Sequence, residues 1–116
     1  MNLDQIARLL DLKLLTAAQD LTTITPTSGY ASDLLSCVMS GAQNKGLWIT
    51  LQAHGNIIAI SALLELAAII ITENAQPDAP TIAKANEEGV ILFSTPLFTY
   101  EIAGRLWEIG IRANPE

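Results

Sequence analysis

The chain is poor in the residue types that most often carry chemistry. It holds one cysteine, Cys37, and one histidine, His54, among 116 residues. A lone cysteine excludes an intramolecular disulfide and a cysteine-rich metal site, and a reducing cytosol is the simplest compartment for it. No second metal ligand stands at a recognised spacing from His54. We therefore expect a cytoplasmic protein that carries no metal ion or other cofactor.

Positive charge is also scarce. Six Lys and Arg are set against twelve Asp and Glu, which gives a net charge of −6. The basic residues are scattered and form no stripe, so the composition excludes a nucleic-acid-binding surface. The most apolar stretch, 57–71, is too short to span a bilayer and contains Glu65. Asp4, Arg8 and Asp11 interrupt the N-terminus, which is not the pattern of a signal peptide.

The stretch 47–74 organises the rest of the chain. Residues 47–51 are uncharged and rich in β-branched and aromatic side chains, which is typical of a buried strand. A polar loop over 52–56 follows, and Asn56 is a candidate N-cap for a helix that continues to about Ala67. The apolar run 68–72 then predicts a second strand. A strand, a helix and a strand in this order form a βαβ unit.

The flanking segments extend this pattern in both directions. Asp78 and Pro80 mark the start of a helix over 80–88, and Gly89 marks its end. The remaining predicted elements are a first helix capped by Asn2, strands at 13–16 and 21–25, a helix capped by Ser32 and running to Ala42, a strand at 90–93, and a last helix that opens after Ser94-Thr95-Pro96 and ends at Gly110, with a frayed tail to Glu116. We expect one domain over 1–116, a three-layer α/β/α sandwich with a mostly parallel sheet and a mixed or antiparallel N-terminal edge.

The predicted binding residues follow the carboxyl ends of the strands, where ligands usually bind in open α/β sheets. Helix N-termini near this edge favour a phosphate or carboxylate group, so we expect a small anionic ligand such as a nucleotide. The candidates are Gln52, His54, Gly55 and Asn56, then Thr72, Glu73 and Asn74, then Ser94 and Thr95, joined by Ser32 and Asp33. The alternative is that these residues are polar only because they lie in loops and cap helices.

Motifs for catalysis are missing. His54 has the residue type and position to contact a ligand, but no Ser-His-Asp or Cys-His pairing is visible in the sequence. Gly41 and Gly46 have the spacing of a phosphate-binding P-loop, yet Leu47 and Trp48 occupy the positions that require Lys and Ser/Thr. We therefore expect a protein that is not an enzyme, with His54 as a general acid or base as the weakest alternative.

A family resemblance extends over nearly the whole chain. It lies in Tyr30–Ser36, Val38-Met39, Leu47–Gln52 with His54, Asn56–Ala59, Ala68–Ile71, Pro77, Lys84-Ala85, Glu88-Gly89 and Ala103–Gly110. In these residues the chain resembles the stand-alone DRTGG-domain proteins. Related domains occur in phosphotransacetylases, at the N-terminus of HPr kinase/phosphatase, and between CBS domains in pyrophosphatases, where they are associated with adenine-nucleotide regulation.

The resemblance implies the α/β fold of the HPr kinase N-terminal domain and a regulatory, ligand-sensing role in a homo-oligomer, which we expect to be a homodimer. The name-giving residues of the family are mostly replaced here. Its Asp-Arg element would fall where this chain has Ala53-His54-Gly55, and its Thr-Gly-Gly element aligns with Thr72-Glu73-Asn74. The two functions left open are a regulatory domain that binds an adenine nucleotide or other small anion, and a structural or interaction subunit that docks on a partner enzyme without a small ligand.

Overall fold

The computed structural model describes residues 1–114 and is built on one five-stranded sheet with the strand order β1-β5-β4-β3-β2. Strands β2 to β5 are parallel to one another, and β1 is antiparallel to β5. This arrangement confirms the mostly parallel sheet and its antiparallel N-terminal edge. The strands are β1 Lys13–Leu14, β2 Gly29–Ala31, β3 Leu47–Thr50, β4 Ala68–Ile71 and β5 Leu92–Ser94.

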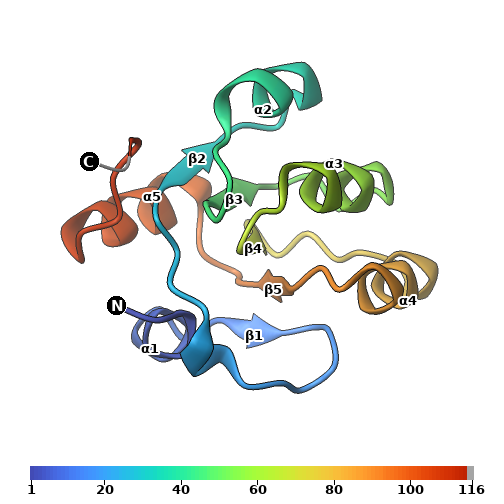
Figure 1. Cartoon of the computed structure of the whole chain (residues 1–116), viewed down its shortest axis with the longest axis horizontal. Helices are drawn as coiled ribbons and strands as arrows, with labels where there is room; N and C mark the ends of the chain where they lie inside the picture. The colour runs from blue at the N-terminus through green and yellow to red at the C-terminus, as the bar shows by residue number, and fades with distance from the viewer. Residues whose placement is uncertain (115–116) are drawn as a thin grey trace.

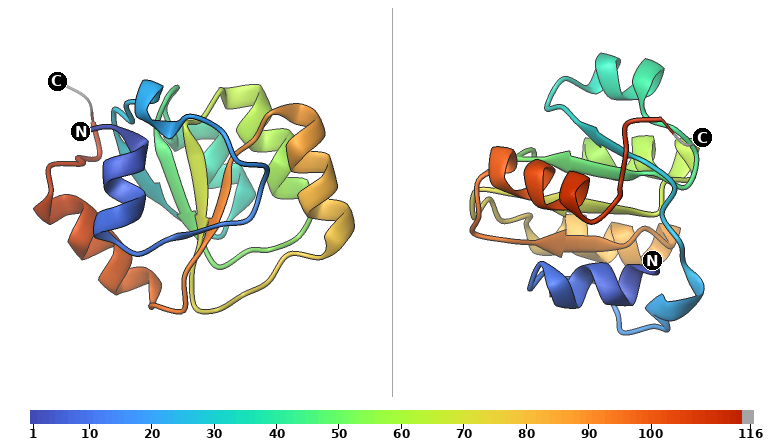
Figure 2. Two further views of the ribbon diagram at one scale, coloured as in Figure 1. Left: turned by 90° about the horizontal axis from the view of Figure 1, so that it is seen from below. Right: turned by 90° about the vertical axis from the view of Figure 1, so that its left-hand side faces the viewer.

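Helices cover both faces of the sheet, as Figures 1 and 2 show. The crossover helices α2, α3 and α4 lie on one face, while α1 and α5 lie on the other. The predicted three-layer α/β/α sandwich is therefore confirmed. The helices are α1 Leu3–Leu9, α2 Leu35–Gly41, α3 Asn56–Leu64, α4 Ala79–Glu88 and α5 Thr99–Glu108, with a short 3-10 turn at Leu21–Thr23.

Each of the two layer interfaces has its own apolar core, and the central strands contribute to both. Every residue of β3 and β4 is buried. Because successive side chains of a strand point to opposite faces, Ile49 and Ile70 pack with α1 and α5, whereas Trp48 and Ile69 pack with α2, α3 and α4. An unbroken apolar run is therefore what the centre of this sheet requires.

Two segments near the N-terminus differ from the prediction. The strand expected over 21–25 is wrong: Leu21–Thr23 is a 3-10 turn, in which the Asp20 carboxylate accepts a hydrogen bond from the Thr22 N–H at 3.0 Å. Residues 29–31, where no strand was predicted, form β2, which pairs with β3. Local propensity did not indicate β2 because Gly29–Ala31 becomes a strand through this pairing.

Helix boundaries were predicted best where a capping residue marks them. Helix α4 begins after Asp78 and ends at Gly89, as expected. Helix α3 is shorter than predicted, because Glu65 adopts a left-handed conformation, with φ of 54°, and ends the helix after Leu64. Asn56 is the first residue of α3 and Gly55 is its N-cap, so the predicted side-chain cap by Asn56 is wrong.

Within residues 1–114 no helix is both long and apolar enough to cross a membrane. The frayed tail predicted to run to Glu116 falls partly outside the described residues.

Ile70 tests the importance of the central strands. It is fully buried in the core beneath α1 and α5, so Ile70→Ala should lower the free energy of unfolding by about 2–5 kcal/mol through lost burial and a residual cavity. Urea denaturation measures this change. Leu63→Ala is the control, since Leu63 is 68% exposed and its loss should change stability by about 0.5 kcal/mol or less. Equal effects of the two substitutions would contradict the burial pattern.

Candidate functional site

The loops after β3, β4 and β5 meet at one edge of the sheet, which we call the carboxyl rim (residues 32–33, 50–56, 72–78 and 94–99). Backbone hydrogen bonds join these loops directly. The Thr72 N–H donates to the Thr50 carbonyl at 2.9 Å, and the Asn74 N–H donates to the Thr95 carbonyl at 3.1 Å. The predicted binding residues therefore do come together along this edge.

Ser32 and Asp33 connect the end of β2 to the end of β3. The Asp33 carboxylate accepts hydrogen bonds from the Thr50 hydroxyl and from the Leu51 N–H, both at 2.8 Å. The Ser32 carbonyl accepts from the indole N–H of Trp48 at 2.8 Å. The Asp33 carboxylate therefore already accepts hydrogen bonds from donors of the protein itself.

The predicted helix cap by Ser32 is wrong. Helix α2 starts at Leu35, two residues later than such a cap requires, and its N-cap is Leu34, which makes no side-chain cap bond. The Ser32 hydroxyl oxygen instead accepts from the Leu34 N–H at 3.1 Å. A serine of this kind closes a local turn ahead of the helix.

Three of the predicted binding residues lie inside the rim. Thr72, Ser94 and Thr95 are 0%, 5% and 3% exposed. The Thr72 hydroxyl hydrogen-bonds with the Thr99 hydroxyl at 2.5 Å, and the Thr95 hydroxyl oxygen accepts from the Leu97 N–H at 3.2 Å. The Thr72 hydroxyl thus links the loop after β4 to the start of α5, and the Thr95 hydroxyl closes a turn within its own loop.

Glu73 and Asn74 form a tight left-handed turn, with φ of 59° at both residues. The Glu73 carboxylate accepts from the hydroxyl of Thr99 at 2.9 Å and from its N–H at 3.3 Å. Thr99 is the first residue of α5, whose N-cap, Phe98, makes no side-chain cap bond. Glu73 therefore caps α5 from another loop and places a negative charge at its positive end.

The open part of the rim is a groove beside α4, with a volume of about 520 Å³. We call it the α4 groove, and it has the size of a small-molecule site, roughly 300–1,000 Å³. The loop after β3 forms one side, where the His54 Nδ1 accepts from the Asn56 N–H at 3.3 Å. Its lining residues are Ala53, His54, Gly55, Gln76, Asp78, Pro80, Thr81 and Lys84.

The acidic and basic side chains of the α4 groove differ in whether they already bind other groups of the protein. Asp78 caps α4, because its carboxylate accepts from the Thr81 hydroxyl at 2.6 Å and from the Thr81 N–H at 2.9 Å. These two bonds, the hydroxyl first, hold the pKa of Asp78 below its usual value. His54 and Lys84 form no ion pair with any carboxylate of residues 1–114. The groove therefore offers two basic side chains outside ion-pair distance of any described carboxylate, with Asp78 close enough to His54 for their attraction to contribute to the lowered pKa of Asp78.

Sequence reasoning found only part of this groove. His54 and Gly55 were predicted to bind a ligand and do line it, whereas Gln52 and Asn56 flank the loop outside its lining. Thr81 and Lys84 were missed, although the sequence does show that α4 starts directly after the rim loop. That Lys84 comes to face the loop after β3 follows only from the packing of α4 beside α3.

No group of three His, Cys, Asp or Glu side chains in residues 1–114 is placed to hold a metal ion. The His54 imidazole makes its side-chain hydrogen bond to a backbone N–H. The groove presents hydrogen-bonding groups and two basic side chains to a ligand.

No family model matches the chain, and no curated protein matches it in sequence. Among solved structures, its fold is similar to the CBS and DRTGG domains of the regulatory region of Clostridium perfringens pyrophosphatase, crystallised with the activator diadenosine tetraphosphate. The TM-score is 0.73 at 15% identity, over 97% of this chain. The match spans about half, 47%, of the other chain. At this identity the similarity shows a shared fold.

Asp33 tests whether the rim is held by its own polar contacts. Asp33→Ala should lower the free energy of unfolding by about 1–3 kcal/mol, because the buried Thr50 hydroxyl loses its acceptor. Asp33→Asn keeps an oxygen at the same position and should recover part of the loss. Denaturation at neutral pH compares the two variants. Wild-type stability in Asp33→Ala would contradict this role.

Asp78, the N-cap of α4, should make the stability of the fold depend on pH in the acid range. Since its folded pKa is lowered, its charge stabilises the fold fully above the unfolded pKa, about 3.9. This contribution is lost as the pH falls through the lower folded value. Asp78→Asn keeps a capping oxygen but cannot titrate, so its unfolding midpoint should depend less on pH in the acid range. Urea midpoints measured at several pH values test this, and superimposable profiles would count against it.

Proposed function

We propose that the protein is a non-catalytic regulatory domain that binds an adenine nucleotide or another small anion in the α4 groove. The proposal includes membership of the DRTGG-domain family, with residues 1–116 as one such domain that acts as a homodimer. The observation that carries it is the pair of basic side chains, His54 and Lys84, in an open groove at the carboxyl ends of the strands.

The electrostatics of the groove favour a phosphate group on its α4 side. The first turn of α4 contributes a partial positive charge, although Asp78 already uses part of it. Lys84 stands on the second turn of the same helix, and His54 faces it from the loop after β3. The Lys84 ammonium can donate hydrogen bonds to phosphate oxygens, and so can the Nε2 of His54, because its Nδ1 already accepts from the Asn56 N–H.

Two supports come from outside the groove. The Clostridium perfringens structure with a similar fold holds a dinucleotide activator and belongs to a regulatory region. The residues of this chain that resemble the DRTGG-domain proteins include His54 and Lys84. Binding without catalysis is consistent with a histidine whose Nδ1 accepts from a backbone N–H. The remaining predicted residues of the rim then act by shaping the loops that border the groove.

The second candidate function is an interaction subunit that docks on a partner enzyme. The specific observation in its favour is exposed apolar surface beside the rim: Leu34, Leu51 and Phe98 are 61%, 41% and 69% exposed. A protein partner would bury these side chains, whereas a nucleotide in the α4 groove would leave them exposed. A measurement of nucleotide binding therefore distinguishes the two proposed functions.

Calorimetric titration with ATP, ADP, AMP and dinucleoside polyphosphates tests the proposal. We expect saturable binding, with Lys84→Gln raising the Kd about tenfold or more, because a charge-assisted hydrogen bond contributes about 1.5–3 kcal/mol. Lys45→Gln is the matched control, since Lys45 precedes β3 at the opposite edge of the sheet. It should bind like wild type.

No binding by any of these nucleotides at millimolar concentration would overturn the proposal and favour docking. Equal loss of affinity in both lysine variants would also count against it, because that result indicates attraction to overall charge.

A further inference from the structure

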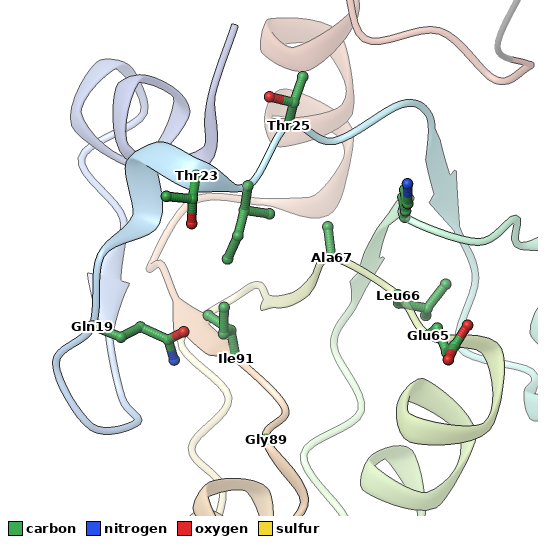
Figure 3. Close-up of a pocket in the computed structure, with 10 residues that line it drawn as sticks. Gln19, Thr23, Thr25, Glu65, Leu66, Ala67, Gly89 and Ile91 are labelled. Atoms are coloured by element: carbon green, nitrogen blue, oxygen red, sulfur yellow. The ribbon is translucent and has the colours of Figure 1, made fainter.

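A second cavity lies at the opposite edge of the sheet, where the strands begin. It has a volume of about 440 Å³ and is shown in Figure 3. We call it the amino-edge cavity. It is separate from the α4 groove and shares no residue with it. Its lining residues are Gln19, Thr23, Ile24, Thr25, Lys45, Glu65, Leu66, Ala67, Gly89 and Ile91.

The base of this cavity is aliphatic and its mouth is polar. Ile91 is buried, and Ile24, Leu66 and Ala67 are half-buried, all of them packed on the two apolar cores. The exposed Gln19 and Thr23 lie on one side, with Glu65 and Leu66 on the other and Ala67 and Ile91 between them (Figure 3). A ligand that enters would place an apolar part on the base and polar groups at the mouth.

Two opposite charges stand together at the mouth. The Lys45 N–H donates to the Glu65 carbonyl at 2.9 Å, and both residues are left-handed, with φ of 65° and 54°. The Asn44 amide donates to the carboxylate of Glu65 at 3.3 Å and so orients it. Within residues 1–114, neither Lys45 nor Glu65 forms an ion pair. Each charge can therefore bind a group of opposite sign on a ligand.

Two helices also end at this cavity. Glu65 is the C-cap of α3 and Gly89 is the C-cap of α4. The C-terminus of a helix carries a partial negative charge and attracts cations. Together with Glu65, these ends favour an ammonium group, whereas Lys45 favours a carboxylate. An inorganic anion would meet two repelling helix ends, and a purely apolar ligand would leave both charges unused.

We propose that the amino-edge cavity is a second binding site, for a small aliphatic zwitterion of the size of an amino acid or short peptide. The ligand ammonium lies at Glu65 and the ends of α3 and α4. Its carboxylate lies at Lys45, and its aliphatic side chain rests on Leu66, Ala67 and Ile91. Gln19 and Thr23 supply hydrogen bonds on the far side, which a second peptide unit would use.

Calorimetric titration of the wild-type protein with leucine and its derivatives tests this assignment. Leucinamide lacks the carboxylate, N-acetyl-leucine lacks the ammonium group, and glycine lacks the side chain. We expect each of the three to bind about tenfold more weakly than leucine, or not at all. Leucyl-leucine distinguishes the two ligand sizes: tighter binding than leucine indicates a peptide site, and weaker binding an amino-acid site.

Substitutions at the mouth of the cavity test whether the ligand binds there. Glu65→Gln and Lys45→Gln should each raise the Kd for leucine, or for leucyl-leucine if it binds tighter, about tenfold. Lys84→Gln in the α4 groove should leave that Kd unchanged. Circular dichroism confirms that each variant is folded, and the ligand series on the wild-type protein does not depend on any variant.

The proposal is overturned if neither leucine nor leucyl-leucine binds at millimolar concentration. It is also overturned if the amide and acetyl derivatives bind as well as leucine, since the two charges then play no part. These outcomes are independent of nucleotide binding, because they concern different ligands and different residues.

Discussion

Parallel pairing of β3 and β4 is the constraint on which the rest of the structure depends. Leu47 to Thr50 stand in register with Ala68 to Ile71, and both strands are buried on both faces. Because β2 to β5 are all parallel, each of these strands ends at the carboxyl rim. Every helix from α2 to α4 ends at the other edge. For α2 to α4, the sheet therefore has one edge of helix N-termini and one of helix C-termini, with opposite electrostatic preferences, whereas α1 begins beside Ile24 at the amino edge.

The carboxyl rim divides its polar residues between two roles. Asp33, Thr72 and Glu73 satisfy buried donors or cap a helix from another loop. Lys84 has no such partner, and His54 accepts only from the nearby Asn56 N–H; both side chains line the α4 groove. The first set fixes the loops against one another, and a fixed loop is what a binding site needs in order to avoid an ordering cost on binding.

Much of the architecture follows from local sequence signals. The apolar runs of β3 and β4, the Asp78 cap and the Gly89 stop were all readable. The features that the sequence did not predict depend on tertiary contacts or on unusual backbone conformation. Strand β2 forms because it pairs with β3. Helix α3 ends early because Glu65 adopts a left-handed conformation usually taken by glycine. That early end also forms one wall of the amino-edge cavity. Among the predicted rim residues, sequence could not separate those that bind within the protein from those that face solvent, since both are polar residues in loops.

The central claim is that the rim of helix N-termini carries the anion site. Backbone amide chemical shifts of the isotope-labelled protein during an ATP titration test it most directly. The account predicts saturable shifts at Ala53–Gly55 and along 76–84, the residues of the α4 groove, with little change at 65–67 and 89–91. Shifts confined to the amino edge, or none at all, would contradict it.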